Sequence, residues 1–374
     1  MFGRNGGVRM QKTQKVNFED ELEGFLSELE RREKPPAIRS ERVHEIHEFI
    51  QRKHPFEQAE RFVARHIRGM EEFKRIVALA SISCFKPVHV IAIGDPASGK
   101  SEIAQAFQEI TPRVRFCWGS KLTAAGLTLA RLGNELKVGV LPSCHVGTAI
   151  IDEFNWIPAT DASAILATMA QQWFSIDKAF LKVPYVPSRL SVIGMANPRG
   201  DYFLSSSPHQ IRRQIPFQSL ALLTRFNLVF IVLRPEIKEF QEISEHQLRY
   251  RMGRETCTFN EKELGLWRDA VLLLRHLRPS WTRGKGFKRR LIAVFTTEAY
   301  REDRRGKLAV PVSPRLNEGI SNLAEAYAKA NMREEVYVRD VIKAIALVAR
   351  SLTPCGLDVE SAMERVAKVV REYA

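Results

Sequence analysis

A glycine-rich segment near residue 100 carries the residue types that bind phosphate groups. The segment from Gly94 to Ser101 has G-x-x-x-x-G-K-S spacing. It follows an apolar run at 88–93 that predicts a buried strand and precedes a predicted helix, which is the context of a P-loop. Glycines let backbone N–H groups approach a β-phosphate, and the helix N-terminus favours the same anion. The residues expected to bind a nucleoside triphosphate are Gly94, Asp95, Pro96, Ala97, Ser98, Gly99, Lys100 and Ser101.

Two acidic residues complete the chemistry that such a loop begins. Asp152 and Glu153 directly follow an apolar run at 148–151. A carboxylate at the end of a parallel strand points toward the bound phosphate, so Asp152 and the Ser101 hydroxyl are the expected Mg²⁺ ligands. Glu153 is expected to polarise the attacking water, and Lys100 to reach the β and γ oxygens. The sequence therefore predicts Mg²⁺-dependent ATP hydrolysis.

Three further polar residues stand at the ends of predicted elements. Asn197 follows a predicted strand at 190–196, where its amide could orient water; ordinary turn chemistry explains it equally well. Arg225 precedes the last apolar strand, too far along the sheet to serve its own phosphate, and suits a finger supplied to a neighbour's ATP. Arg315, at the start of a predicted helix, is a second phosphate-contacting candidate, with a salt bridge at a helix end as the alternative.

The pattern of apolar residues indicates how these groups are positioned. Short, near-continuous apolar runs predict strands buried on both faces of a parallel sheet, at 88–93, 148–151, 190–196 and 228–233. Apolar residues at helical spacing precede them at 18–32 and 40–52 and lie between them at 162–172. After residue 235 the spacing predicts helices alone, at 237–250, 261–277, 316–332, 338–352 and 358–373.

These elements define an expected fold and its divisions. The fold class is α/β, with a P-loop nucleotide-binding domain, an all-helical lid subdomain and a short helical N-terminal region. The expected divisions are 1–57 for the N-terminal region, 58–234 for the nucleotide-binding domain, 235–352 for the lid and 353–374 for a helical tail. Residues 1–16 are polar and basic and are expected to be disordered.

The composition limits which partners the protein can be expected to bind and in which cellular compartment it is expected. The formal net charge is +14, and its positive excess lies after residue 60. A polyanion, with nucleic acid ahead of a membrane surface, is the expected partner; a merely basic surface is the alternative. The five cysteines form no C-x-x-C pair, and no apolar run reaches the length of a membrane span. These features predict a cytoplasmic protein with reduced thiols.

The order and wording of the motifs resemble the AAA+ motor of the minichromosome maintenance (MCM) replicative helicases. The similar segments are GDPASGKS at 94–101, IIDEFNWI at 150–157, QQWFSIDKA at 171–179, ANP at 196–198, LLTRFNLVF at 222–230 and SPRL at 313–316. The resemblance covers roughly residues 60–352, and the QQ-x-x-SI-x-KA pattern is not a general ATPase feature. It implies an AAA+ ATPase of DNA-helicase type that acts in DNA replication with ATP and Mg²⁺.

The resemblance also implies how subunits and DNA are arranged. Lys178 would stand on a hairpin that grips DNA phosphates without regard to sequence. A second hairpin, with a turn at 133–134, would carry Arg131 and Lys137 toward DNA, although both hairpins could be ordinary surface loops. In a homo-oligomeric or hetero-oligomeric ring, Arg225 and Arg315 would act in trans. Acting in cis would be Lys100, Ser101, Asp152, Glu153 and Asn197.

The chain departs from the family pattern at several positions. About sixty residues, predicted to be helical, precede the motor, where MCM helicases carry an OB-fold and usually a zinc ribbon, so a truncated homologue is expected. Lys137 stands where Glu is common, and His145 where Asp or a Gly-rich sequence is usual. Asn155 and Asn227 replace aspartates.

Other readings of the chain stay open. One is a non-motor MCM paralogue that binds ATP, DNA or a helicase subunit without unwinding. Another is a protein-remodelling ATPase of the MoxR or chelatase kind. A basic run suits either nucleic-acid stacking or, more simply, a solvated lid loop. It contains Arg275, Arg278, Trp281, Arg283, Lys285, Phe287, Lys288, Arg289 and Arg290.

Overall fold

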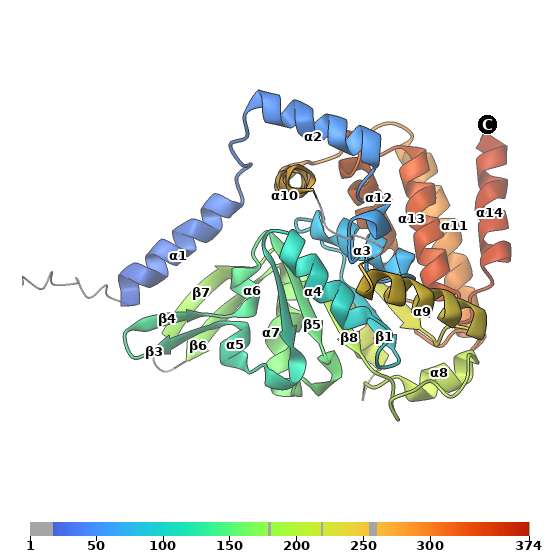
Figure 1. Cartoon of the computed structure of the whole chain (residues 1–374), viewed down its shortest axis with the longest axis horizontal. Helices are drawn as coiled ribbons and strands as arrows, with labels where there is room; N and C mark the ends of the chain where they lie inside the picture. The colour runs from blue at the N-terminus through green and yellow to red at the C-terminus, as the bar shows by residue number, and fades with distance from the viewer. Residues whose placement is uncertain (1–17, 179–180, 218–219, 254–259, 374) are drawn as a thin grey trace, which may run out of the picture.

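A computed structural model describes residues 18–178, 181–217, 220–253 and 260–373. It is an α/β protein with a central parallel sheet, and helices α11 to α14 stand together at one end (Figure 1). Residues 1–16, predicted to be disordered, lie outside the described residues. The divisions at 57, 234 and 352 stay predictions.

Five parallel strands form the central sheet in the order β2-β5-β8-β1-β9. Their bounds are β1 Val90–Gly94, β2 Val114–Trp118, β5 Gly147–Asp152, β8 Leu190–Ala196 and β9 Leu228–Val232. All residues of β1, β5 and β8 are buried, which is why their sequences are near-continuous apolar runs. The four predicted strands are therefore confirmed, and β8 matches its predicted range at both ends.

The sequence analysis did not predict the edge strand β2. It pairs only with β5, with Val114 beside Thr148 and Trp118 beside Asp152. Exposed side chains such as Arg115 interrupt its apolar pattern. An edge strand half open to solvent lacks the continuous apolar run by which the inner strands are recognised.

Helices surround the sheet and continue beyond it. The N-terminal pair is α1 Phe18–Arg32 and α2 Ser40–Lys53. The helices associated with the sheet are α3 Glu71–Ser81, α4 Lys100–Ile110, α5 Ala124–Leu127, α6 Val140–Ser143, α7 Ala159–Gln171 and α8 Pro208–Gln214. The C-terminal helices are α9 Ile237–Arg251, α10 Glu261–His276, α11 Lys285–Arg304, α12 Arg315–Lys329, α13 Val338–Leu352 and α14 Val359–Tyr373. Short 3₁₀ turns lie at Ala59–Arg61, Gly119–Lys121, Phe154–Trp156 and Leu220–Arg225.

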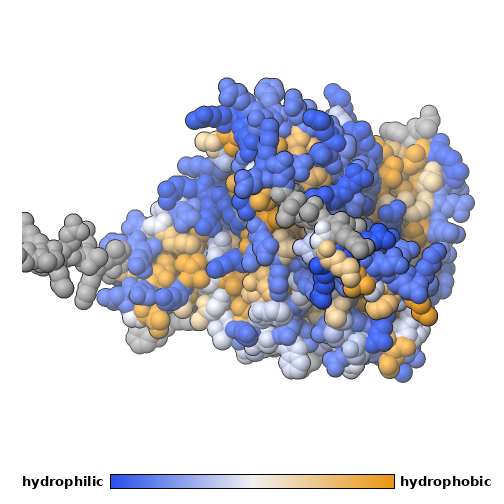
Figure 2. Space-filling model, viewed as in Figure 1, coloured by the Kyte–Doolittle hydropathy of each residue, from blue (hydrophilic) through white to orange (hydrophobic). Residues whose placement is uncertain are grey.

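Two antiparallel hairpins project from the sheet domain at the left of Figure 1. The first joins β3 (Leu129–Leu132) to β4 (Glu135–Val138), with Gly133 at φ +62° in the turn. The second joins β6 (Trp173–Lys178) to β7 (Leu181–Pro187). Both predicted hairpins are thus present. Hydrophobic side chains gather at this end of the surface (Figure 2). Leu132 of β3 and Tyr185 of β7 are exposed.

Helix α1 packs against the first hairpin. The Glu21 carboxylate accepts a hydrogen bond from the backbone N–H of Leu136 at 2.8 Å. The Arg131 guanidinium lies 4.7 Å from the centre of the Phe18 ring, close enough for a cation–π contact. Because Glu21 satisfies an outward N–H of β4, the helix covers an edge that would otherwise offer free backbone donors.

The run from 275 to 290 is not a lid loop. Arg275 lies in α10, and α11 begins at Lys285 and continues for 20 residues. Phe287 and Lys288 are buried on its inner face, and Lys288 Nζ donates to the carbonyl of Val336. The interpretation of this run as one exposed basic surface is therefore wrong; part of it forms the lid core.

Buried cations join the lid to the sheet domain. The fully buried Arg275 donates from Nε to Ser81 O at 2.8 Å and from Nη2 to Pro112 O at 2.9 Å. Lys329 of α12 donates to Ile82 O at 3.1 Å. Ser81 and Ile82 end helix α3, whose carbonyls carry the negative end of the helix dipole. Positive charge is favourable there, and the lid therefore caps a core helix.

We predict that Arg275→Met lowers the free energy of unfolding by about 3 kcal/mol or more, because two charged hydrogen bonds to buried carbonyls are lost. Urea unfolding followed by circular dichroism measures the change. The control is Arg289→Met, in the same basic run but exposed, with an expected change within about 0.5 kcal/mol. Equal destabilisation by both variants would contradict the structural role of Arg275.

Candidate nucleotide-binding site

The strand order brings the predicted catalytic groups to one edge of the sheet. Gly94 ends β1, Asp152 ends β5, and Asn197 directly follows β8, which lies between them. Because these strands are parallel, their carboxyl ends share one edge, where open α/β sheets bind ligands. Residues that are far apart in the sequence are therefore neighbours at this edge.

The loop after β1 needs glycine at both ends for steric reasons. A Cβ on Gly94 would lie 2.5 Å from Val232 Cβ of β9, so the close approach of that strand excludes any side chain. Gly99 has φ +86°, a left-handed conformation that favours glycine, and it precedes the first residue of α4. Ala97 also has positive φ, at +58°. The loop therefore has the glycine requirements predicted from its sequence.

Lys100 lies inside its own loop. Its Nζ donates to Gly94 O and Asp95 O at 2.8 Å each and to Ser98 Oγ at 2.9 Å. Burial lowers the pKa of Lys100 to about 8, a shift that the nearby Asp152 and Asp95 carboxylates oppose. The ammonium group is therefore positioned at the cradle, where a phosphate would restore the solvation that burial removes.

The acidic end of β5 faces the start of α4. The Ser101 hydroxyl donates to Asp152 Oδ2, and the backbone N–H of Glu153 donates to Asp152 Oδ1 at 2.8 Å. A hydroxyl and a carboxylate in contact supply the oxygen ligands that Mg²⁺ uses together with substrate phosphates. The chain's own residues thus fit the predicted Mg²⁺ ligand pair, Ser101 and Asp152.

Glu153 is held by residues that the sequence analysis did not identify. Its backbone has φ +52°, an uncommon value for this residue type. The Ser120 hydroxyl donates to its carboxylate. A Cβ on Gly119 would lie 2.4 Å from Glu153 O, so only glycine allows this approach. Ser120 and Gly119 follow β2, and the failure to predict that strand hid their position.

The Asp95 side chain anchors the loop. Its Oδ1 accepts the backbone N–H of Phe203 at 2.8 Å, and its Oδ2 accepts from Arg234 Nε at 2.9 Å. Arg234 also lies 4.0 Å above the Tyr202 ring. Asp95 therefore ties the P-loop to the segment after Asn197 and to the end of β9. No local sequence signal marks Arg234 as its partner.

The two predicted finger arginines lie together at the other edge of the sheet. Arg225 precedes β9, while Val232 at the far end of that strand pairs with Gly94. A strand of this length separates Arg225 from the P-loop edge by about 13 Å or more. Arg315 Nη1 donates to Arg225 O at 3.4 Å. Neither arginine is brought to its own P-loop.

Asn227 explains one departure from the family pattern. Its Oδ1 accepts the backbone N–H of His89 at 2.8 Å, and its Nδ2 lies 3.5 Å from Arg315 O. A carboxylate could accept the first hydrogen bond but could not donate the second. The amide therefore links the start of β1 to the start of α12.

The predicted DNA-contacting residues lie on the two hairpins. Lys178 is the last residue of β6 and pairs with Leu181 across the turn. Arg131 contacts Phe18 of α1, and Lys137 Nζ lies 2.7 Å from Glu135 Oε2. Arg131 pairs with Leu136 and Lys137 with Ala130, so the two cations lie on opposite faces of their hairpin.

The comparison with known proteins agrees with this geometry. The family model of the MCM P-loop domain matches residues 42–251. The chain belongs to the MCM family. This membership accounts for the P-loop.

Several curated proteins are similar to this chain. The minichromosome maintenance protein MCM of Saccharolobus solfataricus is 29% identical over 317 residues, which cover 80% of this chain and 45% of that protein. The probable DNA helicase MCM8 of Arabidopsis thaliana is 28% identical, over 71% of this chain and 38% of its own length. The probable DNA helicase MCM9 of Oryza sativa is 29% identical, over 72% of this chain and 40% of its own length. The chain therefore spans less than half the length of these relatives.

Two further observations concern the described residues. No helix among them combines the length and apolar character needed to cross a bilayer. Nor do the described ranges contain a group of three or more His, Cys, Asp or Glu side chains arranged for a metal ion. The predicted Ser101–Asp152 pair would supply two ligands, and Mg²⁺ would complete its coordination with phosphate oxygens and water.

The pKa of Lys100 predicts how nucleotide affinity varies with pH. Above about pH 8 the unliganded lysine loses its proton, while a bound phosphate favours the ammonium form, so binding then requires proton uptake. We expect the affinity for a fluorescent ADP analogue to fall by up to about tenfold per pH unit above pH 8. Lys100→Gln should bind weakly with a flat profile over the same range. A flat wild-type profile would contradict the assignment.

Proposed function

We propose that this protein is an MCM-type AAA+ motor that hydrolyses ATP at subunit interfaces and moves on DNA. The observation that carries the proposal is the convergence of Lys100, Ser101 and Asp152 at the carboxyl edge of the sheet. Family membership supports the same reading.

The cis side of the site would act as follows. Lys100 and the P-loop amides would hold the β- and γ-phosphates, with Ser101 and Asp152 as Mg²⁺ ligands. Mg²⁺, when bound, supplies positive charge that stabilises the transferring phosphoryl group. Glu153, positioned by Ser120, would accept a proton from the attacking water, and Asn197 would orient that water.

The trans side would come from a second subunit. Arg225 and Arg315 are in contact with each other but lie at the sheet edge away from the P-loop. A neighbouring copy that places this edge against the P-loop would bring both guanidinium groups to the γ-phosphate. Helix α9 lies against the segment before α3, and His246 Nε2 is 3.1 Å from Arg65 O. Ile237 and Phe240 of α9 are exposed, and the neighbouring copy could bury these apolar side chains.

DNA contact would come from the β6–β7 hairpin through Lys178. Lysine contacts to phosphates are indifferent to sequence, as translocation requires. The net charge of +14 agrees with a polyanionic partner. On the other hairpin, Arg131 and Lys137 would add contacts once freed from Phe18 and Glu135.

The second candidate is a non-motor MCM paralogue that binds ATP and DNA without unwinding. The observation that favours it is the engagement of Arg131 by helix α1 and of Lys137 by Glu135. Strand displacement on a forked duplex separates the two functions, because only the motor gives displacement that Lys100→Ala abolishes.

A mixing experiment tests the trans assignment. Arg225→Ala should lower the ATPase rate by about 10³-fold or more, as for other finger arginines, and Lys100→Ala should do the same. Mixing the two inactive variants should restore part of the wild-type rate, since some interfaces then combine an intact P-loop with an intact finger. Arg304→Ala, an exposed arginine on α11, is the control and should retain full activity. Absence of recovery in stable mixed oligomers would exclude the trans role.

Filter binding at several salt concentrations tests the DNA contact. Lys178→Ala should weaken binding to single-stranded DNA of any sequence and reduce the slope of log affinity against log salt by about one ion. Lys368→Ala, an exposed lysine on α14, should leave both quantities unchanged. An unaltered slope in Lys178→Ala would remove Lys178 from the interface.

A further inference from the structure

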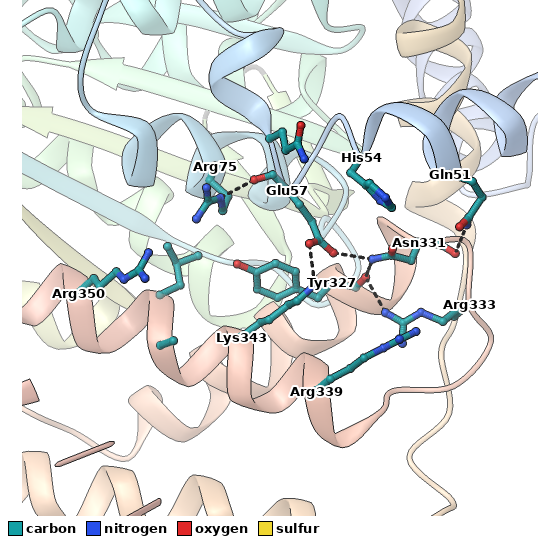
Figure 3. Close-up of a pocket in the computed structure, with 13 residues that line it drawn as sticks. Gln51, His54, Glu57, Arg75, Tyr327, Asn331, Arg333, Arg339, Lys343 and Arg350 are labelled. Atoms are coloured by element: carbon teal, nitrogen blue, oxygen red, sulfur yellow. Dashed lines mark hydrogen bonds and ion pairs between the residues drawn. The ribbon is translucent and has the colours of Figure 1, made fainter. Parts of the chain in front are cut away.

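A basic cavity lies where helices α12 and α13 meet segments that precede the P-loop in the sequence. It has a volume of about 540 Å³, within the range of small-molecule sites. Its walls come from the end of α2 and the segment after it, from α3, and from α12 and α13 (Figure 3). No residue of the P-loop at 94–101 lines it. It is therefore separate from the proposed ATP site.

Helix α13 presents a row of cations to this cavity. Arg339, Lys343 and Arg350 all line it, at intervals of four and seven residues that keep them on one helix face. Arg75 of α3 lines the cavity as well, opposite this row. Arg333 is also a lining residue, but Asp340 neutralises it through two hydrogen bonds of 2.7 and 2.6 Å. Positive charge therefore enters the cavity from two separate elements, α13 and α3.

Tyr327 adds an unused donor. Its side chain is 4% exposed, and its hydroxyl points between Arg75 and Arg350 (Figure 3). Within the described part of the chain, this hydroxyl makes no hydrogen bond. Burial raises the pKa of Tyr327, so the hydroxyl keeps its proton. A nearly buried donor that faces a cavity between two guanidinium groups is suited to an anionic acceptor.

The acidic side chains near the cavity do not occupy all the N–H groups of Arg75 and Arg350. Glu57 is the one carboxylate among the lining residues, and its two oxygens accept from Lys343 at 2.6 Å and Asn331 at 2.8 Å. Glu60 approaches Arg75 only to 3.9 Å, and Glu72 approaches Arg350 to 3.5 Å. Arg75 Nε also donates to the Glu57 carbonyl at 2.6 Å. Each arginine nevertheless keeps further guanidinium N–H groups for a ligand.

We propose that this cavity binds a phosphate group through Arg75, Arg350 and the Tyr327 hydroxyl. Guanidinium groups match tetrahedral oxyanions in geometry and charge, and a phenol donor adds a directional hydrogen bond. Arg339 extends the site for a ligand with more than one phosphate. A bound phosphate would bridge α3 of the sheet domain to α12 and α13 of the lid.

Tungstate, a tetrahedral anion with a strong anomalous signal, tests the location of the site in soaked crystals. We expect one anomalous peak between Arg75, Arg350 and Tyr327, whatever the P-loop binds. A peak at the P-loop alone, or at neither site, would overturn the proposal. Because the P-loop is recorded independently, failure here is distinguishable from failure of the proposed ATPase.

Calorimetric titration with pyrophosphate, in saturating Mg·ADP to occupy the P-loop, measures the affinity. Tyr327→Phe removes a hydroxyl that has no hydrogen-bond partner among the described residues, so folding should be preserved while pyrophosphate binds about tenfold more weakly. Arg350→Gln should have a similar effect, and Arg304→Gln none. Unchanged affinity in both cavity variants would overturn the assignment.

A short oligothymidylate distinguishes the sources of the phosphate. If it competes with pyrophosphate in wild type and loses affinity in Tyr327→Phe, the cavity takes a nucleic-acid backbone. If pyrophosphate binds and the oligonucleotide does not compete, the ligand is a small phosphorylated molecule. Both results support phosphate recognition; absence of pyrophosphate binding contradicts it.

Discussion

The parallel direction of the central strands is the constraint on which both halves of the proposed ATPase depend. Because β1 lies between β8 and β9, one edge of the sheet receives Gly94, Asp152 and Asn197, and the opposite edge receives the start of β9. Arg225 therefore cannot share an edge with the P-loop of its own chain. The packing is tight enough that β9 itself excludes a side chain at Gly94. The proposed ATPase site, in this geometry, would therefore need two copies in a repeating arrangement.

Apolar sequence patterns were sufficient to predict the strands that are buried on both faces of the sheet. The strand at 190–196 could be predicted to the residue because both of its faces are buried, which makes it apolar throughout. The edge strand β2 and helix α11 were missed because solvent-facing charges interrupt their apolar pattern. In α11 a signal was present: Phe287, Leu291 and Phe295 recur every four residues on the buried face. The basic residues at 288–290 obscured it.

Local sequence patterns could not predict the contacts between segments that are distant in the sequence. The P-loop motif identified Lys100 and Ser101, but nothing local pairs Asp95 with Arg234 or Ser120 with Glu153. The departures from the family pattern also became clear only in three dimensions. His145 is buried, and its Nδ1 accepts the Arg189 backbone N–H at 3.1 Å. The pKa of His145 is lowered to about 3 by burial and by the nearby Arg32, Arg189 and Arg113. Its Nε2 lies 3.3 Å from Glu33 Oε1 but makes no hydrogen bond among the described residues. The hydrogen bond that holds the neutral ring is therefore the one to Arg189.

The buried cations of the lid hold the helix that carries one of the two proposed finger arginines. Lys329 at the end of α12 and Arg275 of α10 both donate to the carbonyls that end α3. Removing either contact would leave buried polar groups unsatisfied, so hinge motion at this junction is costly. Arg315 begins the same helix that Lys329 ends, and its contact with Arg225 joins lid and sheet domain again at the other end of α12. A helix held at both ends cannot rotate independently. In the proposed trans arrangement, the two arginines would therefore reach a neighbouring subunit as one preformed pair, and the conformational change of the ATPase cycle would lie between subunits.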